Sequence, residues 1–321
     1  MKSIGELTDF YYNALYPSLK ALEEQRKALA VKAYKIFALI ALLALSGIAV
    51  RWYYFHALDL LSLMFVIAGA IGAAWSYRHI IQDYRTEFKM RIMKPLIEAI
   101  DDSLRYAPVA TVSQSLFERS GLFQGRIDRF TGNDLVQGSI ASVDLQFSDL
   151  HVESVTRDAK GNSHRSTIFQ GLYIVAEFNK HFKSQTIILP DSAEKIFGNV
   201  LGSWLQSKSF GRDRLITLDN AAFEKAFVVY GNDPIESRYI LTHTLMERLL
   251  NLKQSVGHNI YVSFVDANIH IAIAYNKDLF EPTVFQSLLN YDNAMSYIHA
   301  LNLAVGIVEE LKLNERLWSK E

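Results

Sequence analysis

The nine histidines are the first side chains in this sequence whose type suits metal binding or proton transfer. No two of them have the HxxxH or HxH spacing that brings two imidazoles to one ion. His258 and His270 fall on adjacent predicted strands, but pairing about the intervening turn separates them by several residues. The pattern therefore predicts structural and surface histidines, which are His56, His79, His151, His164, His181, His243, His258, His270 and His299.

Two carboxylate pairs, Asp233 with Glu236 and Asp191 with Glu194, have a spacing that also suits acid–base chemistry. The same D-x-x-E spacing forms a capping box, in which the two side chains satisfy backbone N–H groups at the start of a helix. Pro234 follows Asp233 at the first helical position, where proline is favoured. We therefore interpret both pairs as helix caps.

Other catalytic patterns are missing from the sequence. No serine lies in G-x-S-x-G, and no glycine-rich segment has the features of a phosphate loop or a Rossmann fingerprint. The chain has no cysteine, which excludes disulfides, thiol nucleophiles and thiolate zinc sites. The sequence therefore assigns no catalytic, cofactor-binding or metal-binding residue and no cofactor.

Two groups of residues are candidates for binding macromolecules. Tyr230, Arg238 and Tyr239 lie in a segment rich in aromatic and charged residues, which favours either a protein contact or a core corner beside a capped helix. A polar hairpin tip from Thr156 to Ser166 forms the second group. Its basic residues suit contact with anionic lipid or another anion, or simply a solvated loop; they include Arg157, Lys160 and Arg165. With 33 Lys and Arg against 34 Asp and Glu, nucleic-acid binding is not expected.

The elements that position these residues form an α+β domain over residues 107–321. Strand runs are expected within 135–155, after a polar turn at 131–134, and the strands occur in antiparallel runs. Capped helices should begin at Asp191, Asp233 and Thr242. The remaining predicted elements are a helix at 112–120, strands at 168–178, 183–189 and 214–218, a helix at 222–227, a hairpin at 259–275 and a closing helix at 292–311.

The N-terminal part contains two apolar stretches, within residues 36–77. Ile36 to Val50 and Leu60 to Tyr77 carry no charge, and the first is extended by aromatic residues to Phe55. About 20 apolar residues span a bilayer, and Trp and Tyr favour its interfaces. The short connection predicts a transmembrane helical hairpin; a buried hairpin of a soluble protein is the alternative.

Charge predicts the orientation of this hairpin. Six Lys and Arg residues fall within 1–35 and five within 78–94, while the connection between the spans carries only Arg51. The positive-inside rule therefore places both flanks in the cytoplasm. The small-residue pairs of the second span, Ala68 with Gly72 and Gly69 with Ala73, suit packing against the first span or self-association.

Two helices are expected just inside the membrane. Residues 1–35 read as an amphipathic helix interrupted at Pro17, and residues 78–106 as a stalk helix with a kink at Pro95. The stalk has an apolar residue at every fourth position from Tyr84 to Leu104. We expect the two helices to pack together, with a first helix lying on the lipid headgroups as the alternative.

The soluble part resembles a bacterial family catalogued as domain of unknown function 3137, from about Ser113 to the C-terminus. The resemblance rests on FEKAFVVY (from Phe223), DPIESRYILT (from Asp233), LMERL (from Leu245), F-x-GL (from Phe169), FNK (from Phe178) and LN-x-RLW (from Leu313). His243 departs from the pattern, which has proline there. The resemblance implies a bacterial protein with a membrane-tethered cytosolic domain, and it transfers no catalytic residue.

These observations predict a multi-pass protein of the bacterial inner membrane with both termini in the cytoplasm. Its cytosolic domain is expected to act as an adaptor or regulator that binds a protein partner or a second copy of itself. The alternative is a membrane-proximal enzyme or ligand sensor whose site forms only in the folded chain. A channel is disfavoured because neither span contains Asp, Glu or Lys.

Overall fold

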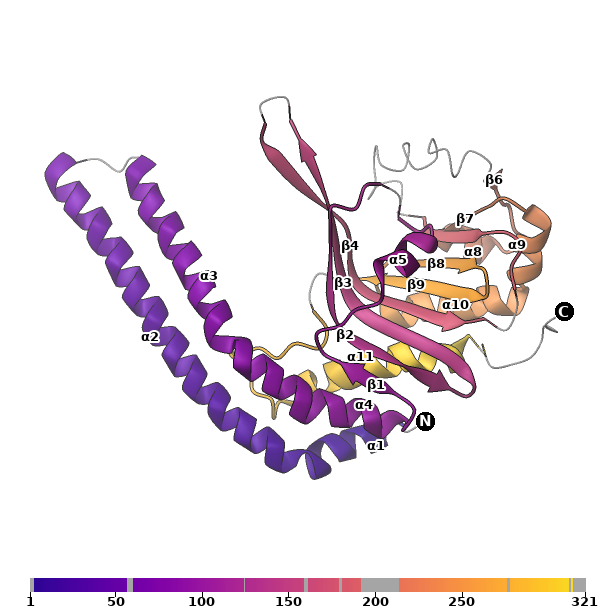
Figure 1. Ribbon diagram of the computed structural model, residues 1–321, viewed down its shortest axis with the longest axis horizontal. Helices are drawn as coiled ribbons and strands as arrows, with labels where there is room; N and C mark the ends of the chain where they lie inside the picture. The colour runs from indigo at the N-terminus through magenta and orange to yellow at the C-terminus, as the bar shows by residue number, and fades with distance from the viewer. Residues whose placement is uncertain are drawn as a thin grey trace. The chain divides into compact units, whose positions relative to one another are not determined.

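The computed structural model describes residues 3–56, 60–123, 125–158, 161–178, 181–191, 214–275, 278–311 and 313 (Figure 1). Contacts divide the chain into two compact units. The helical unit consists of Lys2–Ala99 and Phe280–Ile298, and the sheet unit of Ile100–Leu279 and His299–Glu321. Lys160, the rest of the helix predicted to begin at Asp191, and the family motif beyond Leu313 lie outside the described residues.

The helical unit begins with α1 (Ile4–Asp9), a π-helical turn η1 (Phe10–Ala14) and the long helix α2 (Tyr16–Phe55). A capping box opens α1, because the Ser3 and Glu6 side chains each accept a bond from the other residue's backbone N–H. Pro17 lies in the first turn of α2, where its missing N–H leaves no helical bond unmade. The predicted interruption at Pro17 is therefore confirmed.

The chain returns through α3 (Leu60–Phe88), a second π-helical turn η2 (Lys89–Met93) and α4 (Lys94–Ile100). Pro95 cannot donate to the carbonyl four residues before it, and the π-turn directly precedes it. The every-fourth-residue stripe is buried, as its spacing predicted; it comprises Tyr84, Phe88, Ile92, Leu96 and Ile100.

Small residues let α2 and α3 approach each other. A Cβ on Gly69 of α3 would lie 3.5 Å from both Ala44 and Ile40 of α2. In the same contact, Gly47 of α2 faces the ring of Phe65 of α3. Gly72 has nothing within 4 Å of such a Cβ, so only part of the small-residue pattern serves the contact between the two helices.

A segment from near the C-terminus completes the helical unit. Glu23 and Arg26 of α2 form a buried ion pair with an N–O distance of 2.8 Å. Arg26 donates to the Val284 carbonyl (2.6 Å), and the Glu23 carboxylate accepts from the Leu288 N–H (3.0 Å). Burial alone would raise the pKa of Glu23, but the hydrogen bonds from Arg26 and Leu288 lower it overall. The pair thus fastens residues 284–288 along α2.

Within its described residues, the sheet unit is built on one sheet of nine antiparallel strands in the order β1-β2-β3-β4-β9-β8-β5-β7-β6. This confirms the predicted α+β class and its antiparallel sheet. The strands are β1 (Arg105–Ala107), β2 (Arg129–Ile140), β3 (Val143–Arg157), β4 (Ser163–Glu177), β5 (Thr186–Pro190), β6 (Arg214–Leu215), β7 (Phe227–Gly231), β8 (Ile260–Val265) and β9 (Asn268–Ala274).

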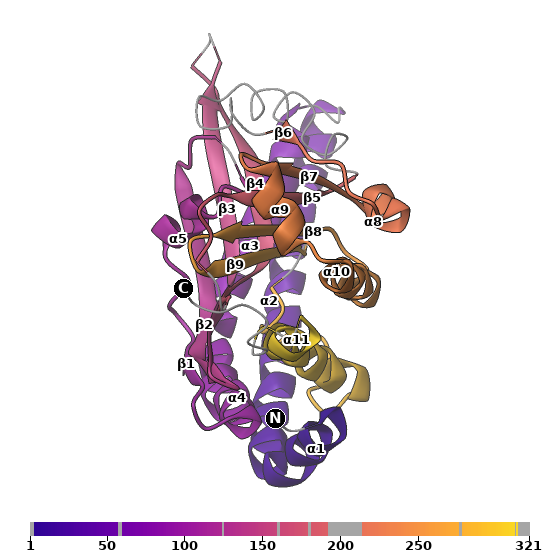
Figure 2. The same ribbon diagram turned by 90° about the vertical axis from the view of Figure 1, so that its right-hand side faces the viewer.

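Helices cover both faces of this sheet (Figure 2). On one face, α5 (Gln114–Arg119) lies over a buried cluster that includes Phe117, Tyr173 and Tyr261. On the other lie α8 (Ala221–Ala226), α10 (His243–Val256) and the part of α11 (Tyr291–Glu310) that belongs to the sheet unit. The predicted hairpin at 259–275 and the Thr242 cap of α10 are confirmed.

A predicted turn was wrong, and one strand was not predicted. The polar residues 131–134 do not form a turn; they lie inside β2, where the register with β3 shifts between Asn133 and Val136. Asp134 adopts a left-handed φ of 60° at this bulge, and its buried carboxylate accepts from the Tyr106 hydroxyl. Strand β7 was missed, because its five residues stand between two helices and show no longer strand pattern.

Candidate functional site

The helix α9 (Pro234–Ile240) presents the most exposed apolar side chain of the candidate interaction segment. Ile235 is 80% exposed and Tyr239, one turn later, is 54% exposed. Arg238 lies beside them, and its guanidinium donates two bonds of 3.3 Å to the Thr217 carbonyl, just beyond β6. We call Ile235, Arg238 and Tyr239 the α9 surface; it combines one aliphatic, one cationic and one aromatic group.

The opposite side of α9 is held rigidly. Asp233 caps the helix by accepting from the N–H groups of Ile235 and Glu236 (2.9 and 3.2 Å). The Glu236 carboxylate accepts from the N–H groups of Lys183 and Ser184 (3.1 and 2.7 Å). Glu236 therefore binds the loop before β5, and its predicted role as the second member of a capping box is corrected. This fixation keeps the α9 surface in one orientation.

Tyr230 is not part of the α9 surface. It lies on β7, where its half-buried side chain packs against the aromatic cluster under α5. The structure thus brings Arg238 and Tyr239 together on one short helix and places Tyr230 on the neighbouring strand, as part of the core packing.

The hairpin of β3 and β4 carries the second candidate group. The two strands extend beyond the rest of the sheet (Figure 1), and Arg157 pairs with Ser163 while Val155 pairs with Arg165. This register puts Arg157 and Arg165 on the same face of the hairpin, and both are exposed. Asp158 at the tip accepts from the Asn162 N–H (2.8 Å) and lies 3.3 Å from His164. Two arginines therefore remain available to an anionic surface.

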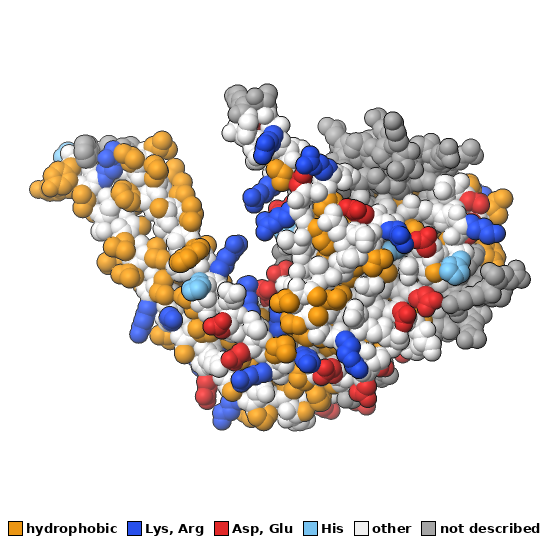
Figure 3. Space-filling model, viewed as in Figure 1, with side chains coloured by type: hydrophobic (Ala, Val, Ile, Leu, Met, Phe, Trp, Pro, Cys, Tyr) orange, Lys and Arg blue, Asp and Glu red, His pale blue; other side chains and the backbone are white. Residues whose placement is uncertain are grey.

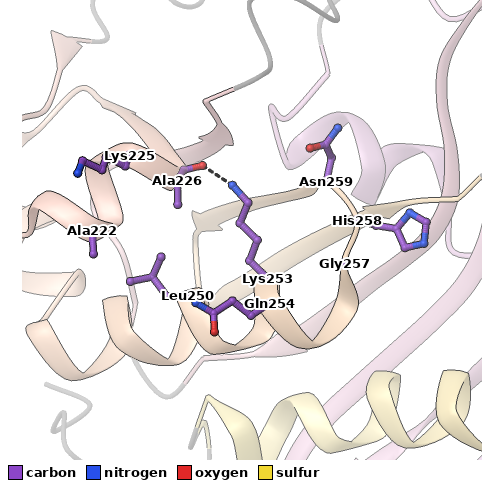
Figure 4. Close-up of a pocket in the computed structure, with 9 residues that line it drawn as sticks. All are labelled: Ala222, Lys225, Ala226, Leu250, Lys253, Gln254, Gly257, His258 and Asn259. Carbon is purple, nitrogen blue, oxygen red and sulfur yellow. Dashed lines mark hydrogen bonds between the residues drawn. The ribbon is translucent and has the colours of Figure 1, made fainter.

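A groove of about 690 Å³ lies between α8 and α10 (Figure 4). Its polar lining is basic or amide in character, from Lys225, Lys253, Gln254, His258 and Asn259. The Lys253 ammonium donates to the Ala226 carbonyl (2.6 Å) and stands 4.6 Å from the centre of the Phe227 ring. Burial lowers the pKa of Lys253, with Asp191 acting in the opposite direction. No sequence pattern predicts this groove, because its two walls come from separate helices.

A buried polar group lies beneath α5. His270 Nδ1 is 2.9 Å from the Tyr173 hydroxyl, which also donates to the Leu116 carbonyl at 3.3 Å. Burial, followed by the nearby Arg119 charge, lowers the pKa of His270 to about 4. His270 Nε2 and the hydroxyl of Ser263, its partner across the strands, have no hydrogen-bond partner within the described part of the chain. Since these groups are inaccessible, this arrangement is structural.

Among the described residues, no group of three or more His, Cys, Asp and Glu side chains is arranged to hold a metal ion. His258 and His270 do not converge: the ring of His258 packs 4.5 Å from that of Tyr275, while His270 points into the core beside Tyr173. The described sites are therefore a surface for contacts, a basic hairpin and an open groove.

Comparison with known proteins finds a family match for the C-terminal part of the chain. Residues 167–313 match the family described as "Protein of unknown function (DUF3137)", a narrower range than the resemblance from Ser113 predicted. No curated protein matches the chain. Among solved structures it is similar to the "crystal structure of the mycobacterial trehalose monomycolate transport factor A, TtfA". That similarity has 9% identity and a TM-score of 0.32, covers 64% of this chain and 88% of that chain, and carries no functional argument. The resemblance recognised from the sequence motifs is therefore confirmed over residues 167–313.

Proposed function

We propose that this chain is a two-span protein of the bacterial inner membrane whose cytosolic domain is an adaptor that binds a protein partner through the α9 surface. The exposed Ile235 and Tyr239 beside Arg238 are the observation that carries the proposal. The match to the DUF3137 family is compatible with this role and names no activity.

The membrane part of the proposal rests on α2 and α3. Both helices are long and apolar enough to cross a bilayer. Only 6% of the most apolar 18-residue stretch of each helix is buried. Figure 3 shows hydrophobic side chains along the visible face of both helices. A soluble protein would bury such surfaces, because exposing them to water is unfavourable. Lipid is the environment that suits them.

The chemistry of the α9 surface favours a protein over a small ligand. Tyr and Arg are enriched among the residues that dominate binding energy at protein interfaces, and an aliphatic neighbour adds area to bury. The hydrogen bonds of Asp233 and Glu236 already fix the helix that carries this surface, so little ordering entropy opposes binding. The β3–β4 hairpin, with Arg157 and Arg165, supplies a separate basic element for anionic lipid headgroups.

The groove between α8 and α10 favours a second candidate function, a sensor of an anionic small molecule. Lys225, Lys253 and His258 line it, and none of the described lining residues is acidic. The adaptor role is preferred because the groove is open to solvent and Lys253 already caps the Ala226 carbonyl. Ligand sites usually enclose most of the ligand surface.

Affinity purification of the full-length protein from its native membrane in mild detergent, followed by mass spectrometry, tests the adaptor function. We expect a near-stoichiometric partner whose recovery falls at least about tenfold on Tyr239→Ala, the size of loss typical of an interface anchor. Tyr291→Ala is the matched control, because Tyr291 is similarly exposed (60%) but lies in the helical unit. Equal recovery with both variants, or a monodisperse protein without a partner, would overturn the proposal.

A further inference from the structure

The loop before α11 brings an aromatic side chain to the base of the two apolar helices. Glu281 is paired with Arg85 of α3 at 3.0 Å, and lies 3.9 Å from Lys89. Three residues further on, Arg26 of α2 binds the Val284 carbonyl. The next attachment is at Leu288, whose N–H binds Glu23 of α2. Phe285 therefore lies between two fixed points of the loop, Val284 and Leu288.

Phe285 contacts three aromatic residues of the helices. Its ring lies 5.5 Å from that of Tyr77, nearly parallel at 11°, and 5.5 Å from that of Tyr34. The ring of Phe37 is 6.5 Å away. Even with these neighbours, 44% of Phe285 is exposed, so part of the apolar ring has no covering side chain.

Two neighbours of Phe285, Phe37 and Tyr77, lie at the same end of the two uncharged stretches. Phe37 is the second residue of the first uncharged stretch, and Tyr77 is the last residue of the second. Lys35 and Arg78 flank these stretches, on the side where charges begin. Aromatic residues next to basic residues at the end of an apolar span are typical of the membrane–water interface.

We infer that Phe285, on the loop 281–288, is a third membrane attachment of this chain, inserting its exposed ring edge into the headgroup region of the inner leaflet. The inference rests on the proposed membrane insertion of α2 and α3. Its partner is lipid, because the four rings are continuous with the apolar surface of the spans. A loop fastened by Glu281 and by the Glu23–Arg26 pair holds the ring at that depth without a helix of its own.

The absence of cysteine allows single spin labels to be placed in the full-length protein. After reconstitution in phosphatidylglycerol–phosphatidylethanolamine vesicles, label depth is measured from collision rates with oxygen and with a nickel chelate. Phe285→Cys and Gln286→Cys report on the loop, the latter with the aromatic ring retained. Leu43→Cys lies in the first apolar stretch.

Leu289→Cys is the matched control for the loop. Its neighbour Leu288 binds Glu23, which precedes Ile36 by thirteen helical residues, or about 20 Å. Leu289 is exposed (38%), and this distance from the apolar stretch should place its side chain in water. We expect oxygen to collide with the label at position 285 several-fold more often than with the label at position 289. The label at 285 should lie about 5–10 Å below the headgroup surface. Gln286→Cys should be shallower than Phe285→Cys but deeper than Leu289→Cys.

The outcomes separate this inference from the membrane proposal on which it rests. If labels at 285 and 286 collide with the nickel chelate as often as the label at 289, while Leu43→Cys stays protected, the lipid contact is overturned and the spans remain. If Leu43→Cys is itself open to the chelate, the membrane proposal fails as well.

Discussion

At the residue scale, the sheet core holds two neighbouring polar atoms that lack a hydrogen-bond partner within the described residues. The Ser263 hydroxyl is fully buried beside His270, and neither it nor His270 Nε2 has a hydrogen-bond partner within the described residues. A second buried serine, Ser237 of α9, is instead bonded to the Thr186 hydroxyl at 2.8 Å. The two serines therefore differ in hydrogen bonding while sharing size and burial.

This difference predicts opposite effects of the same substitution. Ser263→Ala should raise the free energy of unfolding by about 1 kcal/mol, because a desolvated hydroxyl without a partner is removed. Ser237→Ala should lower it by about 1 kcal/mol, because Thr186 loses its partner. Denaturant unfolding of the purified full-length variants measures both. A destabilised Ser263→Ala would mean that a bound water satisfies Ser263 and His270.

At the scale of single elements, Gly171 of β4 allows the backbones of β4 and β9 to approach closely. It has a φ of +145°, and a Cβ there would overlap the Ile273 carbonyl of β9 and lie 2.7 Å from the Tyr275 nitrogen. Gly161, in the β3–β4 hairpin tip, has a φ of +83° and nothing within 4 Å. Both glycines relieve backbone strain, and only Gly171 is also confined by neighbouring backbone.

Gly171→Ala is therefore expected to reduce the free energy of unfolding by about 3 kcal/mol or more, from φ strain and overpacking together. Gly161→Ala should cost about 1–2 kcal/mol, from the left-handed conformation alone. The midpoints of thermal unfolding of the two variants and the parent protein test this ranking. Equal midpoints for the two variants would contradict the close approach of β4 and β9.

The sequence predicted elements that follow from local patterns. The stripe through Phe88, the Asp233 cap and the hairpin about Asp266 all depend on neighbours within a few residues, and all are present. The bulge at Asp134 was read as a turn, because the same polar residues favour both and only the partner strand distinguishes them. The groove at Lys253 and the bonds of Glu236 to Lys183 join distant segments, for which no local pattern exists.

At the scale of the whole molecule, the proposed topology has a direct test that again uses the lack of cysteine. His56→Cys lies at the end of α2, beside the connection between the spans, and Val109→Cys lies in the sheet unit at a side chain that is 91% exposed. An impermeant maleimide added to intact spheroplasts should label position 56, and should label position 109 only after lysis. The reverse pattern would place the sheet unit outside.

The order in which the helical unit is made has a consequence for its biogenesis. Tyr11 and Phe88 emerge early, but their contacts with Leu288 and Tyr297 come from a stretch translated roughly 200 residues after Ala99. At bacterial elongation rates of about 5–20 residues per second, this delay lasts about 10–40 s. During this delay the nascent chain keeps an uncovered apolar surface beside α2 and α3. A ribosome that stops before residue 280 would release a chain permanently in that state, the kind of surface that chaperones and membrane proteases recognise.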